Sequence, residues 1–596
     1  MYLKCHTRFK DGKEHHYWSI EEKIRCRDGR TVDRHILYLG AINDDQRADW
    51  IRCIEAFDEE QGKSVQLALF PEDKPIPEDI SDTGIQICLY GFRLHRPRQW
   101  GMCWIFVEIW NELHLDSFWK PRLVDSREGT SWYHILMVLT AYRLIDPGSE
   151  WRLHRLWYER SAMGDLLGED FSLAAKDNLY RCLDKLITHK EDLFSFLHER
   201  WQDLFGLKYD ILLYDLTSTY FEIDPRSSDG GKRKFGYSRD HRSDCVQVVI
   251  ALVVTPEGFP LAYETLPGNT VDNTTLRMFL DKIQNRYGKA RRVWIMDRGI
   301  PTDKILKEMR ESDPPIQYLV GTPKGRLSKL EAGLTEKPWK KARKDVRVKL
   351  LSEEQELYVY VESANRVQKE RSMRKRRMKR LWNRLKTLQT QRPTYETLLL
   401  KIGAAKKDAG RVQSLIEIFL PEPPEKGHRS NRVNFSFRLN RSRLKEVRRR
   451  EGRYLLRSNL TETDPSLLWN YYLQLTEVEA AFKNLKGDLA VRPVYHQLEE
   501  RIEAHIFVSF LAYCIHCTLK EKLRQKAPGL TVRQCLDKMK GIEMLDVHFP
   551  TTDGRELIFT RYTEPEKDQL LLLSQLKLQL PVQPPPKISA KKEIQM

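Results

Sequence analysis

The chain has 596 residues, which is too long for one compact core, so we expect two to four domains. Its composition, 41% hydrophobic and 31% charged, excludes a disordered or fibrous protein. The formal net charge of +17 can serve solubility, a membrane surface or a nucleic acid. Because the sequence shows neither a lipidation signal nor an interfacial helix, the charge favours a nucleic-acid partner.

Cysteine usage and apolar runs bear on where the protein works. The ten cysteines lack the dense spacing of a secreted disulfide scaffold, which indicates a reducing compartment. The first residues contain no apolar core, so no signal peptide is expected. The longest apolar run, Ile502–Leu519, carries Glu503, His505 and His516 and is interpreted as a buried helix rather than a bilayer span. We therefore expect a cytosolic protein without a membrane partner.

The N-terminal third divides into a strand-rich part and a helical part. Residues 1–42 alternate apolar and polar side chains around two Asp-Gly turn dipeptides, which predicts a three-stranded β meander that could contact DNA. Residues 61–98 are rich in Pro, Asp and Gly and predict a linker. From Trp104 onward apolar residues recur at helical spacing, so a mainly helical domain is expected over 43–206.

Residues 207–324 show short apolar runs that alternate with helical patterns. The predicted order, β-β-β-α-β-α-β, indicates an α/β fold in which helices pack on the faces of a mixed sheet. The expected strands lie at 209–217, 245–255, 259–266, 292–297 and 316–320, and the expected helices at 273–287 and 302–311.

Residues 325–451 lose that order and become strongly basic, which predicts an insertion in the core. Lys369–Lys386 holds ten Lys or Arg against one Glu, while a helical stripe of apolar residues runs through it, so a long basic amphipathic helix is expected. We hypothesise that the insertion contacts DNA. The tract proposed for this contact is Arg374, Lys375, Arg376 and Arg377, and the stripe is Met378, Leu381, Trp382, Leu385 and Leu388.

The chain is expected to rejoin the core at residues 452–525. Tyr454–Ser458 predicts a returning strand, and Pro465 to Lys486 predicts one helix. The remaining C-terminal region, 526–596, is expected to end in a disordered Pro-rich tail that begins at Pro581.

Two of the predicted strands end on a carboxylate, Asp215 and Asp297. A carboxylate at the C-terminal end of a strand points into the loop region where α/β sheets build their sites. Mg²⁺ and Mn²⁺ prefer oxygen ligands, and three converging acids could hold two such ions for phosphoryl transfer. The alternative is that each Asp caps a turn or forms an ion pair.

The third acid is expected on the helix that ends at Lys486, which offers Glu477 and Glu479. In a helix Glu479 shares a side with Phe482, Lys483 and Lys486, and Tyr472 lies two turns earlier on that side. Such a side could hold metal, stack a base and clamp a phosphate. An ordinary surface helix with ion pairs is the alternative.

Five motifs in this order carry a resemblance to a known family. They are Tyr214–Tyr220, Phe235–Asp244, Pro267–Thr275, Met296–Gly299 and Val478–Phe482, with Arg492–His496 behind them. Together they resemble the bacterial insertion-sequence DDE transposases of the "insertion sequence four" superfamily, from about Tyr209 to Leu519.

The resemblance implies an RNase H-like catalytic core split by the insertion. It implies that Asp215, Asp297 and Glu479 bind two Mg²⁺ or Mn²⁺ ions. Of the superfamily's Tyr-Arg-Glu-Lys signature, Tyr472, Glu479 and Lys486 fit, but Leu475 stands where the Arg is expected. This departure leaves the metal ligands intact but removes that Arg's phosphate contact. The candidate DNA contacts around the acids are Arg298, Tyr472, Lys483, Lys486 and Arg492.

The sequence therefore predicts an enzyme that binds the terminal inverted repeats of its own element, cleaves both ends and joins the 3′-hydroxyls to target DNA. Because an element has two ends, a homodimer on double-stranded DNA is expected. An RNase H-like nuclease or resolvase that cleaves without joining is one alternative. A catalytically inactive DNA-binding regulator derived from a transposase is the other.

Overall fold

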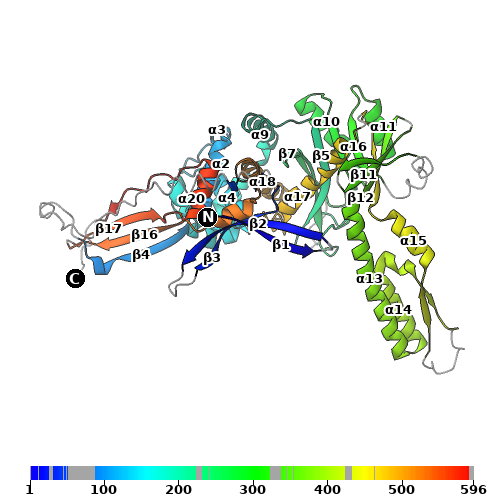
Figure 1. Cartoon of the computed structure of the whole chain (residues 1–596). Coiled ribbons are helices and arrows are strands. Elements are labelled where there is room, and N and C mark those ends of the chain that lie inside the picture. The colour runs from blue at the N-terminus through cyan, green and yellow to red at the C-terminus, as the bar shows by residue number, and fades with distance from the viewer. Residues whose placement is uncertain are drawn as a thin grey trace. The chain divides into compact units, whose positions relative to one another are not determined.

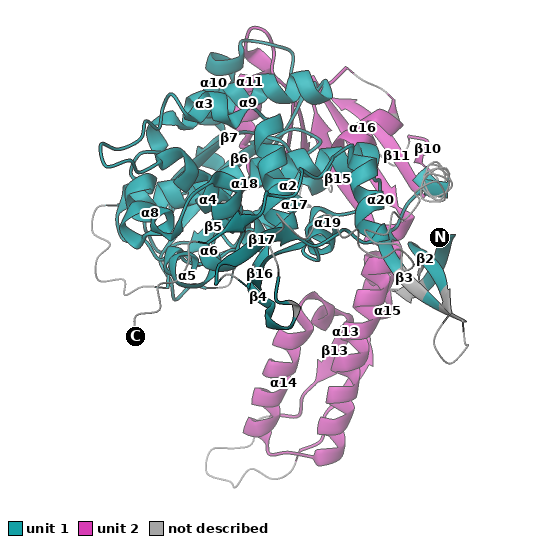
Figure 2. Ribbon diagram, turned by 90° about the vertical axis from the view of Figure 1, so that its left-hand side faces the viewer, with its two compact units in different colours: residues 1–7, 16–292, 474–596 teal, residues 8–15, 293–473 magenta. Residues whose placement is uncertain are grey.

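Two compact units make up the chain. The computed structural model describes residues 2–589 except 11–12, 26–30, 44–45, 48–49, 52–86, 223–230, 241, 298, 323–336, 344, 354, 423–432, 462–463 and 553. Unit 1 comprises residues 1–7, 16–292 and 474–596, and unit 2 comprises residues 8–15 and 293–473 (Figure 2).

The N-terminal residues form the expected meander. The strands β1 (Tyr2–Lys10), β2 (Lys13–Arg25) and β3 (Thr31–Gly40) make a three-stranded sheet in chain order, and β2 and β3 run antiparallel. Leu39 is buried between the exposed Tyr38 and the partly exposed Gly40, as a period of two predicts. Around Ile20 and Leu37 the period does not hold, because Ser19, Glu21 and Ile36 are buried as well.

The helical domain of unit 1 surrounds one apolar helix. This helix, α18 (Glu499–Lys526), packs against α4 (Trp132–Ile145) and α2 (Gly101–Glu112). It is long and apolar enough to cross a membrane by length and composition, yet 94% of its apolar window is buried inside the protein. The prediction of a buried helix is confirmed. The other α-helices described in this domain are α3 (Leu115–Trp119), α5 (Glu150–Arg152), α6 (Tyr158–Arg160), α7 (Met163–Leu167), α8 (Lys176–Leu183), α9 (Lys190–Phe205), α19 (Val532–Met539) and α20 (Lys567–Leu576).

A second sheet of unit 1 joins residues from both ends of the chain. Its order is β18-β17-β16-β4, with β4 at Arg93–Gln99, β16 at Glu543–Pro550, β17 at Glu556–Tyr562 and β18 at Lys587–Ile588. The linker predicted for 61–98 is wrong at its end, because residues 93–98 pair with β16; residues 61–86 lie outside the described part.

The Pro-rich tail is ordered as far as residue 589, which corrects the expectation of disorder there. Gln583 accepts a hydrogen bond from the backbone N–H of Tyr562 at 3.1 Å and donates one to its carbonyl at 2.8 Å. The backbone groups of β17 would otherwise lack partners along this edge, and the tail supplies them.

Three strands of unit 1 form the first part of the predicted core. The strands β5 (Ile211–Tyr220), β6 (Gln247–Val254) and β7 (Pro260–Pro267) pair antiparallel, and Asp215 lies opposite Leu252. The prediction that Asp215 ends its strand is wrong. The β-branched and aromatic residues that follow it continue to pair with β6, so Asp215 lies in the middle of β5. The helix α10 (Leu276–Tyr287) follows β7.

Unit 2 contains a mixed six-stranded sheet. The strands β8 (Val293–Met296) and β9 (Gln317–Gly321) are parallel and connected by α11 (Asp303–Glu311). The other neighbours are antiparallel, in the order β9, β15 (Arg453–Ser458), β12 (Glu356–Ser363), β11 (Val346–Glu353) and β10 (Lys340–Arg343). The mixed α/β fold is therefore confirmed. The insertion does not simply lose the strand order, because its first part adds β10, β11 and β12 to the sheet.

The basic part of the insertion is a helical arm, defined as residues 364–450 (Figure 1). The helices α13 (Ala364–Gln391) and α14 (Tyr395–Ala409) pack side by side, and α15 (Arg441–Arg450) follows the short strands β13 (Ile416–Phe419) and β14 (Ser436–Leu439). The predicted amphipathic helix is confirmed, since Leu381, Leu385 and Leu388 of α13 are buried in the core of the arm.

The predicted helix from Pro465 to Lys486 is two helices. One is α16 (Pro465–Leu473) and the other is α17 (Leu475–Lys486), with a turn at Gln474 between them. The helical offset from Tyr472 to Glu479 therefore crosses an interruption and also the boundary between the two units.

Two histidines of α18 make the stability of the fold sensitive to acid. Burial lowers the pKa of His505 and of His516 from 6.5 to about 4. Their folded pKa is depressed, so the stability they contribute is fully present above pH 6.5 and is lost as the pH falls towards 4. We expect each histidine to remove up to about 1.4 kcal/mol of unfolding free energy per pH unit in this window.

Urea denaturation at several pH values between 7 and 4.5 checks this expectation. His516→Gln should flatten the decline by about the contribution of one histidine, or about 1.4 kcal/mol per pH unit. The matched control is His114→Asn at an exposed position, which should leave the slope unchanged. A stability independent of pH over this range would contradict the role of the buried histidines.

Candidate active site

Two of the three predicted acids lie on elements of unit 1 that pack together. Asp215 is half-buried in the middle of β5, and α17 packs against this strand and against β6. Glu479 is exposed on α17 and has no ion pair or hydrogen bond from its carboxylate among the residues that the structure describes. The fold of unit 1 therefore brings the strand of the first acid and the helix of the third acid together.

Asp297 belongs to unit 2. It directly follows the buried strand β8 and is exposed, as predicted for a carboxylate at a strand end. Its neighbour Arg298, a predicted DNA contact, lies outside the described residues.

Glu477 and Glu479 differ in what their carboxylates contact. Glu477 accepts a hydrogen bond from Nζ of Lys520, on α18, at 2.7 Å. Two residues later the helix has turned by about 200°, so Glu479 points away from α18. Glu477 is occupied by this ion pair, which favours Glu479 as the third acid.

The chemistry of the three acids suits a hard divalent cation. All three offer carboxylate oxygens, the ligands that Mg²⁺ and Mn²⁺ prefer. The described residues place no lysine or arginine on the carboxylate of Glu479, so none of these cations competes with a metal there.

Two cations meet at Asp240 in unit 1. Its Oδ1 accepts a hydrogen bond from Nζ of Lys486 at 2.9 Å and also forms an ion pair with Nη1 of Arg492. Burial lowers the pKa of Lys486, and the charge of Asp240 opposes that shift. Two predicted DNA contacts are thus brought together and oriented by one carboxylate, which the sequence alone did not single out.

The loop that carries Asp240 also reaches β5 and the loop after β7. The backbone N–H of Arg239 donates to Oγ of Ser218 at 3.4 Å, and its guanidinium pairs with Asp272 at 2.5 Å. Tyr220, at the end of β5, lies under the guanidinium groups of Arg242 and Arg492. Four of the five sequence motifs therefore meet inside unit 1.

The remaining predicted DNA contacts fall into two classes. Lys483 on α17 and Lys375, Arg376 and Arg377 on α13 are exposed. Tyr472 instead packs against Tyr454 and Trp469 inside unit 2, with tilted rings at centroid distances of 5.4 and 6.0 Å.

Arg374 is not available to DNA, which corrects its assignment as a contact. Its side chain is 6% exposed, and its Nε lies 2.5 Å from Oε1 of Glu451, whose side chain is 4% exposed. This buried pair ties α13 to the end of α15 and leaves the guanidinium no free face for a phosphate.

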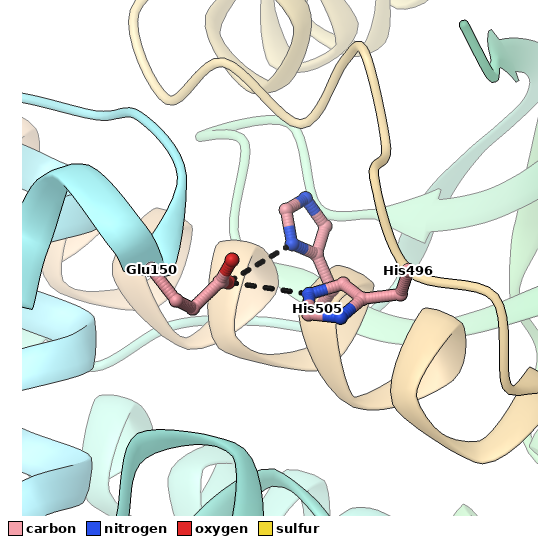
Figure 3. A group of neighbouring side chains, drawn as sticks. All are labelled: Glu150, His496 and His505. Carbon is pink, nitrogen blue, oxygen red and sulfur yellow. Dashed lines mark hydrogen bonds and ion pairs between the residues drawn. The ribbon is translucent and has the colours of Figure 1, made fainter. Parts of the chain in front are cut away.

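A buried cluster, named here the Glu150 cluster, consists of Glu150, His496 and His505, which Figure 3 shows, together with Arg143. Ligand atoms of the acid and the two histidines lie within 4.8 Å of one another. Burial alone would raise the pKa of Glu150, but hydrogen bonds from the histidines lower it well below its usual range. Nη2 of Arg143 lies 3.5 Å from Oε1 of Glu150 and 3.4 Å from Nδ1 of His505. A divalent cation would be repelled by this guanidinium, which already neutralises the carboxylate.

Sequence reasoning missed Asp240 and the Glu150 cluster. Asp240 lies inside one of the five motifs, but the motif does not say which cations it contacts. Glu150 follows a helix-capping Ser149, and this pattern gives no sign of the two histidines more than three hundred residues later. Only the folded arrangement identifies these partners.

Comparison with known proteins gives one family match. Residues 208–399 match the family model of the transposase DDE domain. This range contains Asp215 and Asp297 and ends before Glu479. Comparison with curated proteins finds no match. A cryo-EM structure of the piggyBac transposase synaptic complex with hairpin DNA is similar over 73% of this chain and 77% of that chain, with 9% sequence identity and a TM-score of 0.34.

Proposed function

We propose that this protein is a DDE transposase of the "insertion sequence four" type, which cleaves the ends of a bacterial insertion sequence and joins them to target DNA. The single observation that carries the proposal is the match of residues 208–399 to the transposase DDE domain, because this range includes two of the three acids. The packing of α17, which bears Glu479, against the strand of Asp215 supports the third.

The chemistry follows from the acid side chains. Asp215, Asp297 and Glu479 would hold two Mg²⁺ or Mn²⁺ ions, which supply activation of the attacking hydroxyl and stabilisation of the leaving oxygen. An antiparallel β5-β6-β7 set followed by the parallel pair β8 and β9 supports an RNase H-like core. Lys486 and Arg492, oriented by Asp240, would neutralise a phosphate beside the acids.

The helical arm of unit 2 supplies the DNA-binding surface of the proposal. Exposed cations cover α13 and α15, whereas their apolar residues pack inside the arm. The exposed cations of α15 are Arg441, Arg443, Lys445, Arg448, Arg449 and Arg450. Such a surface binds the phosphate backbone irrespective of base sequence, through release of counterions.

Substitution of the acids tests the catalytic part. Asp215→Asn, Asp297→Asn and Glu479→Gln should each lower Mg²⁺-dependent cleavage of terminal-repeat DNA by on the order of 10²–10³-fold or more. Binding should be nearly unchanged, because phosphate contacts elsewhere supply most of the affinity. Cleavage and binding are measured on DNA that carries the inverted repeats flanking the gene.

Glu477→Gln is the matched control, since it changes the same residue type two positions away and disturbs only the pair with Lys520. It should retain cleavage. Loss of cleavage with Glu477→Gln but not with Glu479→Gln would move the third ligand to Glu477. Cleavage without joining by the wild-type chain would favour a nuclease or resolvase.

Neutralising the exposed tract of α13 tests the DNA-binding part. The triple change of Lys375, Arg376 and Arg377 to Gln should weaken binding to all sequences, because fewer DNA phosphates are neutralised and fewer counterions are released. The slope of log K against log salt should fall by about 0.9 for each phosphate that the variant no longer neutralises. Binding is measured at several salt concentrations.

Arg374→Gln is the contrasting variant on the same helix. It should leave the salt slope of the folded protein unchanged but lower the unfolding free energy by about 3 kcal/mol. The reason is that the buried carboxylate of Glu451 loses its ion pair with Arg374 and keeps that with Arg371. If the slope of log K against log salt is unchanged in the triple variant, the tract is a solvated helix face that does not contact DNA.

Assembly is the last element of the proposal. One set of acids serves one DNA end at a time, so we expect two copies on the two ends, with the DNA neutralising the mutual repulsion of two chains of charge +17. Light scattering should show monomer alone and a two-protein complex once end DNA is added. In mixtures of wild type with Asp297→Ala, some complexes should cut one end only; equal cutting of both ends would contradict paired active sites.

A further inference from the structure

The Glu150 cluster lies beside the chain segment that leaves α17. We propose that Glu150 and His496 are positioning residues, which hold residues 487–498 and through them keep α17 and Glu479 in place against β5. This inference rests on the proposed function of Glu479 and extends it to residues that contact neither DNA nor metal.

The cluster collects side chains from separate parts of unit 1. Glu150 begins α5, Arg143 lies in the last turn of α4, and His505 lies on α18. The fourth member, His496, comes from the segment itself, and its Nε2 lies 3.3 Å from Oε1 of Glu150. The same oxygen lies 3.4 Å from Nδ1 of His505. One buried carboxylate thus ties the segment to three helices.

A second contact of the cluster reaches the segment's backbone. Nη1 of Arg143 donates to the carbonyl of Ala490 at 3.3 Å. Ala490 has a positive φ of 40°, which alanine rarely adopts, so the surrounding contacts must hold it. The cluster therefore fixes the segment at two points, Ala490 and His496.

The segment needs such anchors because it has no helix or strand of its own. Its described backbone bonds to the rest of unit 1 include Val491 N–H to the carbonyl of Leu485 at 2.9 Å and Val494 N–H to the carbonyl of Tyr220 at 3.3 Å. Apolar contacts of Leu489, Val491 and Val494 bury it, but apolar packing alone specifies position weakly. Buried polar groups define the position more strictly, because each of them destabilises the folded state unless its hydrogen-bond partner is in place.

The anchored segment leads directly to the acid site. Between Ala490 and His496 lies Arg492, which pairs with Asp240, and Asp240 in turn binds Lys486 at the end of α17. A displacement of the segment would pull on this pair and shift α17, which carries Glu479. Displacements of about 1 Å in a catalytic group can lower a rate by on the order of 10²-fold.

A metal ion is the competing interpretation of the same group, because two imidazoles and a carboxylate are also zinc ligands. The position of Arg143 disfavours it. The guanidinium of Arg143 lies within 3.5 Å of two of the three ligand atoms. A bound divalent cation would add two positive charges beside it, and the single carboxylate of Glu150 would have to offset the charge of the metal and of the arginine.

The test compares His496→Ala with His496→Gln in the full chain. Glutamine places an amide N–H near the position of Nε2, so it should restore the hydrogen bond that alanine removes. The matched control is His134→Ala, which breaks another histidine–glutamate pair of unit 1, His134 to Glu169 at 2.6 Å, away from the segment. Circular dichroism first establishes that each variant is folded.

Hydrogen–deuterium exchange is the readout that does not depend on catalysis. His496→Ala should raise the exchange rates of residues 487–498 and of the last turn of α17 by about tenfold or more. His496→Gln should restore them, and His134→Ala should leave them unchanged. Equal exchange in His496→Ala and wild type would overturn the proposal.

Cleavage supplies the second readout. His496→Ala should bind end DNA normally but cleave on the order of 10²-fold more slowly, with a higher Mg²⁺ concentration for half-maximal rate. A loss that His496→Gln does not rescue would overturn the positioning role. Binding of one zinc ion per chain, abolished in His505→Asn, would also overturn it in favour of a metal site. If wild type cleaves nothing while the exchange result holds, the proposed function fails but the anchoring of the segment is supported.

Discussion

A carboxylate shared between two cations is the interaction on which much of this protein depends. The chain has 101 Lys and Arg against 84 Asp and Glu, so acids are the scarcer partner. Several acids therefore contact two cations each, and removing one of them would take an ion-pair partner from both cations. Examples are Asp240 with Lys486 and Arg492, Glu264 with Lys190 and Lys282, Glu356 with Arg310 and Arg457, Glu362 with Arg347 and Arg453, and Asp546 with Arg96 and Arg98.

This use of acids separates structural charges from the charges proposed for function. Acids that hold the fold together are buried and paired, as Glu451 is with Arg374. Glu479 is exposed, and its carboxylate has no ion-pair partner among the described residues, which leaves it available to a metal. The cations divide in the same way, since Arg374 is buried while Lys375 beside it faces solvent. A basic tract in this protein is therefore part scaffold and part exposed surface, and the proposed function assigns the exposed part to DNA.

The sequence by itself determined the features that depend on near neighbours along the chain. Alternation with a period of two located the N-terminal meander, short apolar runs located the core strands, and helical spacing located the helical domain and the long basic helix α13. The net charge pointed to nucleic acid because charge adds up irrespective of fold. Asp215 and Asp297, two of the three predicted acids, lie in the range that matches the transposase DDE domain.

Only the tertiary structure decided the features that depend on partners far away in the chain. Asp215 lies in the middle of its strand because β6 continues to pair beyond it. Arg374 is structural because Glu451, 77 residues later, lies beside it, and Asp240 meets Lys486 across 246 residues. The Glu150 cluster spans 346 residues from Glu150 to His496. Local periodicity reports which side chains face a core, but it contains no information on which distant charge each buried polar group will meet.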